Sequence, residues 1–250
     1  MAGTALRGRL TWRVATVSAV REETQTARTL VLDVPDWPGH LAGQHVDVRL
    51  TAPDGYRAMR SYSIASAWPS SPAGGAKVDL TVEQVPDGEV SPYLGQVIGV
   101  GDPLEIRGPV GGWFVWRPEQ PGPIQLIGGG SGMVPLMAIL RAAELAGRQP
   151  DVRLLYSVRR PESVLYAGEL ARSKSEIAFA YTREGPAGER IGRIDAEVLA
   201  RSAWSPDVGA TVYVCGPTPF VETVADLLVA AGHDPAQVRT ERFGPSGGGR

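Results

Sequence analysis

Cysteine and histidine are almost missing from this chain of 250 residues, and their scarcity excludes several kinds of site. The single cysteine, Cys215, permits no intramolecular disulfide, no four-cysteine iron–sulfur cluster and no cysteine-based zinc site. The three histidines, His40, His45 and His233, are scattered without the spacing of metal ligands. We therefore expect no bound metal ion in this chain.

The chain also lacks a long apolar run and an excess of charge of one sign. Its formal net charge is −2, so no field of the whole molecule favours nucleic acid or an anionic membrane as a partner. Without a long apolar run at the N-terminus, neither a signal peptide nor a membrane-spanning helix is predicted. We expect a cytoplasmic protein with no nucleic-acid partner and no membrane span.

The first half of the chain contains short, β-branched-rich runs separated by turns rich in Gly, Pro and Asp. Six such runs without a long helix between them predict an antiparallel six-stranded barrel over residues 1–118. One short helical turn is expected near 91–95. The predicted strands are 10–20, 28–34, 44–50, 60–65, 78–85 and 103–107.

The second half has a different pattern, and the Pro-rich stretch 117–123, which cannot continue a strand ladder, marks the boundary. Apolar runs of parallel-strand type alternate there with segments whose apolar residues follow helical spacing. A two-domain β + α/β chain is therefore predicted, with a Rossmann-like parallel-sheet domain over residues 119–250. Its predicted strands are 124–127, 152–158, 177–181, 212–214 and 238–243, and its predicted helices 134–146 and 220–231.

The segment Arg60-Ser61-Tyr62-Ser63 contains the residue types that hold a flavin by its phosphates and its ring. Arg60 can donate two parallel hydrogen bonds to a phosphate. Tyr62 is two residues further on and shares the same face of the strand, and Ser63 adds a hydroxyl and a backbone amide. Taken alone, the segment also fits an edge strand with a surface arginine and a half-buried tyrosine.

A second segment, Gly88-Glu89-Val90-Ser91, precedes the predicted helical turn. Gly88 allows the backbone to approach a ligand closely. Ser91 can cap the turn and leave free amides for a phosphate. An ordinary capped turn is the alternative.

The segment Gly130-Ser131-Gly132-Met133-Val134-Pro135 follows a predicted strand and opens a predicted helix. Its glycines let the backbone meet a pyrophosphate, and the helix N-terminus supplies free N–H groups. Pro135 stands where the usual dinucleotide fingerprint has a third glycine, and it fits the first turn of a helix. The segment predicts a dinucleotide loop, with a structural glycine turn as the alternative.

The end of the next strand distinguishes the two nicotinamide dinucleotides. NAD-type sites often place a carboxylate about 20 residues after the loop, but residues 156–160 contain no acid. Ser157 and Arg159 can bind a 2′-phosphate instead, which favours NADPH while leaving NADH possible. Solvated surface arginines are the alternative.

A last segment, Cys215-Gly216-Pro217, ends a predicted parallel strand at the carboxyl edge of the sheet, where ligands of such sheets bind. No histidine stands nearby in the sequence to activate Cys215, so a covalent nucleophile is not required. A small buried thiol that fills the core is the alternative.

Taken in order, segments 60–63, 130–135 and 214–217 resemble the ferredoxin–NADP reductase superfamily of FAD-dependent, NAD(P)H-oxidising electron-transfer proteins. The resemblance covers about residues 12–244. It is to stand-alone reductases of the oxygenase-reductase and flavohaemoglobin-reductase-module type, without a fused iron–sulfur domain. Many relatives carry a basic residue upstream of Gly88 where this chain has Glu83. Phosphate binding is therefore expected to depend more on Arg60 and backbone amides.

The resemblance also implies roles for individual residues. Arg60 holds the FAD pyrophosphate, Tyr62 packs on the ring, and Ser63 approaches N5. The segment 88–91 makes the second pyrophosphate contact, and Phe243 shields the other face of the ring, although a core phenylalanine is an equal alternative. Residues 215–217 lie beside the nicotinamide, and Arg183 contacts the 2′-phosphate. Ser63 and Cys215 are thus the candidate catalytic residues.

The implied function is transfer of electrons from NAD(P)H through FAD to a separate acceptor. A ferredoxin-type carrier of an oxygenase or a similar terminal enzyme is the expected acceptor, and a haem or molybdenum enzyme is another candidate. Two alternatives remain: a flavin reductase that releases reduced flavin, and a flavin-binding regulatory module without turnover. The sequence leaves open the acceptor, the oligomeric state and the choice of FAD over FMN.

Overall fold

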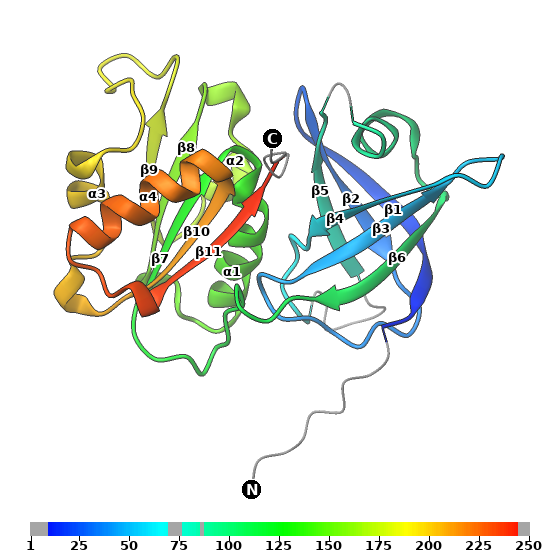
Figure 1. The fold of residues 1–250 in the computed structure, drawn as a ribbon, viewed down its shortest axis with the longest axis horizontal. Coiled ribbons are helices and arrows are strands. Elements are labelled where there is room, and N and C mark those ends of the chain that lie inside the picture. Colours follow the sequence, from blue (N-terminus) through cyan, green and yellow to red (C-terminus); the bar gives the residue numbers. More distant parts are fainter. Residues whose placement is uncertain (1–9, 70–76, 86–87, 245–250) are drawn as a thin grey trace, which may run out of the picture.

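A computed structural model describes residues 10–69, 77–85 and 88–244 of the chain. Two sheets lie side by side in it, an antiparallel one built from the first half of the chain and a parallel one built from the second (Figure 1). The predicted β + α/β fold class is confirmed.

The antiparallel sheet has the strand order β4-β3-β6-β1-β2-β5. It curls until its two outer strands approach, and an isolated bridge from Ile64 to Leu80 joins them. Alternate side chains such as Val46 and Val48 point into the barrel and are fully buried. The six strands are β1 (Trp12–Thr24), β2 (Ala27–Asp33), β3 (His45–Thr51), β4 (Arg57–Ser63), β5 (Lys77–Glu83) and β6 (Pro103–Val110).

The second sheet is parallel throughout, with the order β11-β10-β7-β8-β9. Its central strand β7 is buried along its whole length, as expected for a strand covered on both faces. The strands are β7 (Ile124–Gly129), β8 (Val152–Val158), β9 (Glu176–Tyr181), β10 (Thr211–Pro217) and β11 (Val238–Phe243). The helices are α1 (Met133–Leu145), α2 (Ala167–Leu170), α3 (Ala196–Ser202) and α4 (Thr218–Ala230).

Helices cover both faces of the parallel sheet, and one of these layers also meets the barrel. Helices α3 and α4 pack on the face away from the barrel. On the other face, Leu136 and Ile139 of α1 share one buried cluster with Ala27, Ala42 and Ala65 of the barrel half. The two halves are therefore joined by a continuous apolar core.

Some elements differ from the sequence prediction. The expected turn at 91–95 is a π-helical turn at Tyr93–Val97. The short helices α2 and α3 were not predicted, because four and seven residues are too few to show a helical period. In the described part of the chain, no helix combines the length and the apolar character needed to cross a membrane.

Candidate functional site

Strand β4 carries the residues predicted to bind the flavin, and it runs toward the α/β half (Figure 1). Antiparallel pairing places Arg60 opposite Val48 and Tyr62 opposite Val46. Arg60 and Tyr62 therefore share the face of the strand that the sequence predicted. Ser63 is opposite His45 on the other face.

The guanidinium of Arg60 is exposed, and a carboxylate is bound to it. Nη2 donates to Oε2 of Glu89 at 2.6 Å, and Nη1 donates to the carbonyl of Met59 at 2.8 Å. The second carboxylate oxygen of Glu89 accepts from the Tyr56 hydroxyl at 3.0 Å. The side chains of Arg60 and Glu89 remain 55% and 49% exposed, so a ligand phosphate can reach the guanidinium and compete for it.

Tyr62 is half-buried and packs against the barrel core. Burial raises the pKa of its hydroxyl to about 12, against the opposing effect of Arg60. The ring is therefore neutral at physiological pH, with one part in the core and one part accessible. Such a ring suits stacking on a planar ligand.

The segment at 88–91 connects β5 to the π-helical turn, and one prediction for it is wrong. Ser91 does not cap the turn: its hydroxyl accepts a hydrogen bond from the amide of Val85 at 3.1 Å. The Gly88 amide is also engaged, donating to the Val85 carbonyl at 2.9 Å. The hydroxyl turns back because Gly88 brings the chain close to it: a Cβ at Gly88 would lie 2.7 Å from Ser91 Oγ. Ser91 therefore fixes the shape of this loop, while Val90 is buried in the barrel core.

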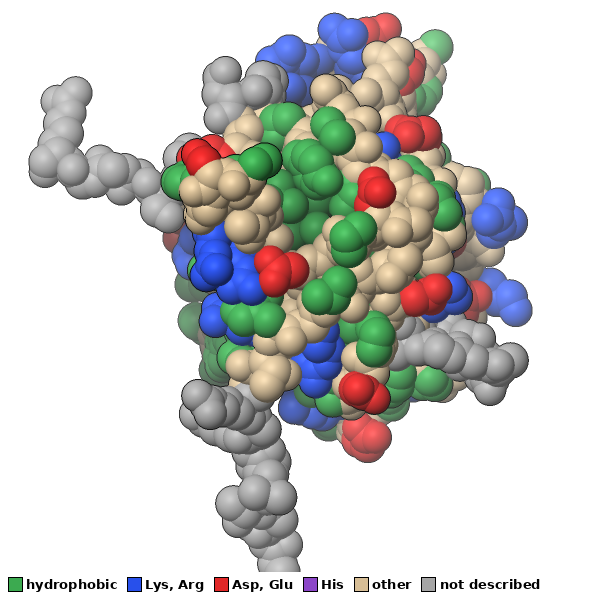
Figure 2. All heavy atoms as spheres, turned by 90° about the vertical axis from the view of Figure 1, so that its right-hand side faces the viewer, with side chains coloured by type: hydrophobic (Ala, Val, Ile, Leu, Met, Phe, Trp, Pro, Cys, Tyr) green, Lys and Arg blue, Asp and Glu red, His purple; other side chains and the backbone are tan. Residues whose placement is uncertain are grey.

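An apolar groove of about 700 Å³ begins at Glu89 and extends over the barrel face that points away from the α/β half. Its lining includes Val14, Tyr56 and Tyr93, whose side chains are exposed. Hydrophobic side chains gather around a hollow on this side of the molecule in Figure 2. The groove thus continues from the Arg60–Glu89 pair along the outside of the barrel.

The predicted dinucleotide loop forms a 3-10 turn at Gly130–Gly132 between β7 and α1. Gly130 has a φ of +55°, and a Cβ built there would meet nothing within 4 Å, so the loop has an open side. Gly132 faces the opposite way: a Cβ there would lie 2.2 Å from the carbonyl oxygen of Cys215. Pro135 is the third residue of α1 and stays within its first turn, while the Met133 amide bonds back to the turn.

The same contact brings Cys215-Gly216-Pro217 against the loop, at the carboxyl ends of β7 and β10. Cys215 is 1% exposed, and burial raises the pKa of its thiol, with a further increase from the carboxylate of Glu241. The thiol is therefore neutral, which fits a packing or contact group and not a thiolate nucleophile.

The three residues predicted at the 2′-phosphate lie on adjacent strand ends. Ser157 is buried at the end of β8, next to Gly129 of β7. The backbone amide of Arg183 donates to the carbonyl of Arg159 at 3.1 Å, which holds the two arginines together beyond β8 and β9. Both arginine side chains are exposed. The structure thus brings Ser157, Arg159 and Arg183 to one edge of the sheet.

The flavin and dinucleotide segments meet at the boundary between the two halves. Ala65, two residues after Ser63, belongs to the same buried cluster as Met133 of the loop and Cys215. Phe243, the last residue of β11, packs against this cluster and is half-buried. The ends of the flavin strand, the dinucleotide loop and the segment at Cys215 therefore meet where the barrel packs against the α/β half.

Comparison with known proteins agrees with this arrangement. An oxidoreductase FAD-binding domain model matches residues 14–115, and an oxidoreductase NAD-binding domain model matches residues 126–226. The chain belongs to the ferredoxin–NADP reductase superfamily. The FAD-binding model matches the barrel, and the NAD-binding model matches the half with the parallel sheet.

Similar proteins include reductase components of oxygenase systems. The reductase component of propane 2-monooxygenase from Rhodococcus jostii (strain RHA1) is 32% identical over 80% of this chain and 55% of its own length. The ferredoxin reductase component of 3-ketosteroid-9-alpha-monooxygenase from Rhodococcus rhodochrous is 32% identical over 92% of this chain and 64% of its own. The chain thus spans between 55% and 64% of the length of these two relatives.

Among solved structures, the flavohem-like FAD/NAD-binding domain of nitric oxide dioxygenase from Vibrio cholerae O1 biovar El Tor superimposes with a TM-score of 0.81. It is 26% identical, and the match covers 93% of this chain and 99% of that one. The two-domain architecture of the present chain therefore matches this solved structure over nearly the full length of both.

One group beside Cys215 was missed by sequence reasoning. Glu241 of β11 pairs in register with Cys215 of β10, and its Oε2 is buried without a hydrogen-bond partner among the described residues. Burial raises the pKa of this carboxyl group to about 7. Parallel pairing of β10 with β11 was the signal that could have found it, since both strands were predicted but their register was not.

Tyr156 was also missed, because a tyrosine inside a buried strand gives no signal of a second role. Its hydroxyl donates to the carbonyl of Gly130 at 3.1 Å, and burial raises its pKa. This hydrogen bond from β8 thereby fixes the position of the predicted dinucleotide loop.

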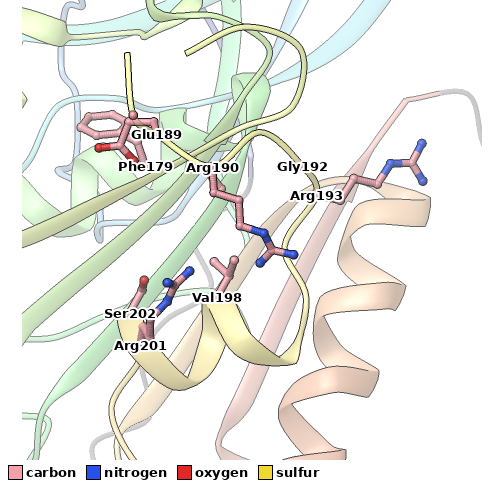
Figure 3. A pocket seen from close by; sticks show the side chains of 10 residues that line it. Phe179, Glu189, Arg190, Gly192, Arg193, Val198, Arg201 and Ser202 are labelled. Atoms are coloured by element: carbon pink, nitrogen blue, oxygen red, sulfur yellow. The ribbon is translucent and has the colours of Figure 1, made fainter. Parts of the chain in front are cut away.

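A separate pocket of about 320 Å³ lies between β9 and α3 (Figure 3). Three arginines line it, but Arg190 is already bound to Asp195, and Arg201 lies 3.6 Å from Glu197. None of the predicted site residues lines this pocket. In the described residues, no group of three His, Cys, Asp or Glu side chains is placed to hold a metal ion.

Proposed function

We propose that this chain is an FAD-dependent NAD(P)H reductase that passes electrons to a separate acceptor protein. The observation that carries the proposal is the buried cluster that Ala65, two residues beyond Ser63, shares with Met133 of the dinucleotide loop and with Cys215. This cluster joins the end of the flavin strand to the dinucleotide loop. FAD, when bound, supplies a ring that accepts two electrons and a proton as hydride and returns the electrons to an acceptor.

On the barrel, we propose that Arg60 binds the FAD pyrophosphate, Tyr62 packs on the flavin ring and Ser63 lies near N5. The exposed guanidinium and the half-buried tyrosine ring fit these roles. Glycine at 88 and the backbone of 88–91 form the second side of the phosphate site. The adenosine half of FAD is assigned to the apolar groove that starts at Glu89, which supports FAD over FMN.

In the parallel-sheet half, we propose that residues 130–135 bind the dinucleotide pyrophosphate with backbone amides. Cys215, Gly216 and Pro217 hold the nicotinamide, and Phe243 covers the flavin ring opposite Tyr62. Catalysis in this scheme is positioning: the two rings are held in contact with water excluded. Ser63 and Cys215 are the proposed catalytic residues, and neither acts as an acid or a base.

NADPH is the proposed preferred donor, because the exposed guanidinium groups of Arg159 and Arg183 lie at one edge of the sheet, next to the buried Ser157. The division of the chain at residue 118/119 is part of the same proposal, and the two family models lie on either side of it. A ferredoxin-type acceptor is supported by the relatives, which are reductase components of oxygenase systems. A cytoplasmic location is part of the same proposal. A haem or molybdenum enzyme is the second candidate acceptor.

The first test is anaerobic rapid mixing of the FAD-loaded protein with NADPH and, separately, NADH, recording the loss of flavin absorbance. Fast reduction by NADPH and slow reduction by NADH are expected, with the difference abolished in Arg159→Gln/Arg183→Gln. The reverse preference refutes the 2′-phosphate assignment but keeps the reductase. A protein that binds no FAD refutes the whole proposal.

One observation favours a second candidate. Because Arg60 is exposed and already paired with Glu89, flavin can be held loosely, as in a flavin reductase that releases reduced flavin. Gel filtration of the FAD-loaded protein separates the candidates: flavin that stays with the protein supports the electron-transfer role, whereas loss of flavin supports the flavin reductase.

A further inference from the structure

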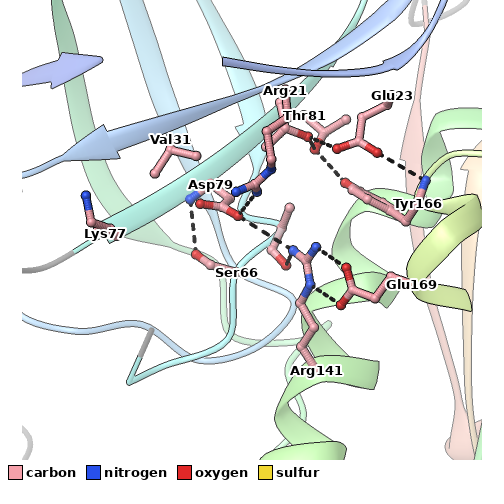
Figure 4. Close-up of polar contacts among 12 residues, drawn as sticks. Arg21, Glu23, Val31, Ser66, Lys77, Asp79, Thr81, Arg141, Tyr166 and Glu169 are labelled. Carbon is pink, nitrogen blue, oxygen red and sulfur yellow. Dashed lines mark hydrogen bonds and ion pairs between the residues drawn. The ribbon is translucent and has the colours of Figure 1, made fainter. Parts of the chain in front are cut away.

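A half-buried polar contact joins the two halves of the molecule (Figure 4). Arg141 of α1 donates from Nε and Nη2 to the two carboxylate oxygens of Glu169 at 2.8 and 2.7 Å, which fixes its guanidinium plane. The remaining nitrogen, Nη1, crosses to the barrel and donates to the carbonyl of Ala65 at 2.8 Å. It also lies 3.8 Å from the carboxylate of Asp79 on β5.

A second contact across the boundary is made by Tyr166, just before α2. Its hydroxyl donates to Thr81 Oγ1 of β5 at 2.5 Å, and its backbone amide donates to Glu23 of β1 at 3.3 Å. Thr29 closes the ring, since its hydroxyl lies 2.6 Å from Glu23 and 2.7 Å from Thr81. The barrel thus binds both the backbone and the side chain of one residue of the other half.

Tyr166 has a backbone φ of +57°, in the left-handed region that a tyrosine rarely adopts. Its ring is buried, and the Arg141 guanidinium lies 5.1 Å from the ring centre. A residue keeps such a conformation only where its surroundings hold it firmly. The two contacts across the boundary are therefore one packed unit, which we call the clamp: Arg141, Glu169, Tyr166, Thr81 and Glu23.

The clamp is attached directly to both predicted ligand segments. Helix α1 begins directly after the dinucleotide loop and carries Arg141 two turns later, so one continuous helix connects the two. On the other side, the carbonyl that Arg141 holds belongs to Ala65, two residues beyond Ser63. Tyr156 adds a link on the first side, because its hydroxyl contacts both the Gly130 carbonyl and the Leu165 amide.

We propose that Arg141 and Tyr166 are positioning residues that set the nicotinamide against the flavin. Each residue fixes the angle and distance between the helix that starts at the dinucleotide loop and the strand that ends at Ser63. This inference rests on the proposed function for its catalytic consequence. It assigns to the clamp an effect on the rate of hydride transfer and not on the affinity for either ligand, because neither residue belongs to the predicted binding segments.

The test uses the FAD-loaded protein and three variants: Arg141→Met, Tyr166→Phe and the control Arg153→Met. Arg153 is a matched control because it binds Glu176 at 2.8 Å and covers the Trp204 ring at 3.9 Å, entirely within the α/β half. Rapid mixing gives the limiting rate of flavin reduction and the dinucleotide Kd separately. A misplacement of about 1 Å can cost about 100-fold in rate, so we expect Arg141→Met to lose at least about 10-fold.

Tyr166→Phe removes one hydroxyl from the clamp and is expected to lose about 3- to 10-fold in limiting rate, in line with a single hydrogen bond. In both variants the dinucleotide Kd and the FAD Kd should stay within about 3-fold of the parent, as should every constant of Arg153→Met. The proposal is overturned if the limiting rates of both variants match the control, or if their loss lies in Kd. Should Arg141→Met fail to fold, Tyr166→Phe and Thr81→Val decide the matter alone.

A measurement without turnover separates this inference from the proposed function. Small-angle X-ray scattering of the FAD-loaded proteins should give a slightly larger radius of gyration for Arg141→Met than for Arg153→Met, since the halves lose the hydrogen bond to Ala65 and keep only the apolar core and the Tyr166 contacts. If neither dinucleotide reduces the parent protein, the proposed function fails, and an unchanged radius of gyration then also rejects the clamp. If reduction is normal but the radius and the rates of the variants are unchanged, only the clamp is rejected.

Discussion

The two segments proposed to bind phosphate groups are built in different ways in the two halves of this molecule. The barrel relies on side chains: the guanidinium of Arg60 is exposed, and it is already paired with Glu89. The parallel-sheet half relies on backbone: Gly130 leaves one side of its loop open, while Gly132 fits against the carbonyl of Cys215. The side chains of the barrel segment can therefore change partners when a ligand binds, whereas the backbone of the glycine loop has its conformation fixed beforehand.

This difference has a consequence for how each half tolerates change. An exposed ion pair contributes little to stability, so its members can be replaced while the barrel stays folded. A backbone packed against backbone has no side chain that can move aside, so a single added carbon displaces the loop. Substitutions in the α/β half should therefore have the larger effects on function.

The largest effect is expected for Gly132→Ala. The new Cβ would lie 2.2 Å from the Cys215 carbonyl oxygen and 2.7 Å from the Gly216 nitrogen, both backbone atoms. Either the loop or the end of β10 must shift, and kcat/KM for NAD(P)H should fall by at least about 100-fold. FAD binding should be unchanged, because the barrel is not involved. Steady-state kinetics and a flavin titration measure the two quantities.

Gly147→Ala is the matched control for this substitution. Gly147 has a φ of +68° with open space around its Cβ position, so alanine there costs backbone strain without a clash. It should lower stability and leave kcat/KM within about 2-fold. Equal kinetic losses in the two variants would mean that strain, and not the contact with Cys215, explains the effect.

The next effect is expected for Arg60→Gln on the barrel. Hydrogen bonds between charged groups contribute about 1.5–3 kcal/mol, so the FAD Kd should rise by roughly 10- to 100-fold. Fluorescence titration of the flavin-free protein measures it. Arg57→Gln removes an exposed charge from the same strand on the opposite face, and it should leave the FAD Kd within about 2-fold. A similar loss in both variants would mean that Arg60 acts only through overall charge.

The same contrast between backbone and side chains explains what the sequence could predict. The glycines of 130–132 and the β-branched runs report directly on backbone shape, so the fold class and the loop between strand and helix were predictable. Side-chain partners depend on register and on tertiary contacts. The pairing of Arg60 with Glu89, the hydrogen bond from Val85 to Ser91 and the approach of Glu241 to Cys215 were therefore not predictable.

The boundary between the halves was the least accessible feature from sequence. Nothing in a lone arginine within a helical period marks Arg141 as a link to the barrel, and its partner Ala65 contributes only a carbonyl. Tyr166 has an ordinary side chain but an unusual backbone angle, which sequence does not display. Contacts made by backbone atoms of one half with side chains of the other leave no local pattern.

A third prediction concerns the buried carboxyl group of Glu241 on β11, beside Cys215. Burial raises the pKa of Glu241 to about 7 from the usual 4.5. The folded chain therefore holds this proton more tightly than the unfolded chain, so the stabilisation is complete below about pH 4.5 and is lost as pH rises through about 7. Removing the carboxylate should therefore benefit the protein at high pH and not at low pH.

Urea unfolding of Glu241→Gln measures this directly. Relative to the parent, the variant should gain stability on going from pH 5 to pH 8, by at most about 3 kcal/mol. Glu222→Gln, on the exposed surface of α4, tests the loss of a carboxylate alone and should show no such trend. A pH-independent difference between parent and Glu241→Gln would contradict the raised pKa.

The smallest effect is expected for Glu89→Gln, and it sharpens the comparison most directly. If the carboxylate occupies Arg60 before FAD binds, FAD must displace it, and its charge also repels the incoming phosphates. An exposed ion pair contributes about 0.2–1 kcal/mol, so releasing Arg60 should tighten FAD binding by roughly 2- to 5-fold. The gain should shrink at high salt, because both terms are electrostatic and screened. In the Arg60→Gln background the same substitution should give a smaller gain, since only the repulsion between Glu89 and the phosphates is then relieved. Weaker FAD binding by Glu89→Gln would instead mean that Glu89 contacts the ligand, and that the barrel site is as fully shaped beforehand as the glycine loop.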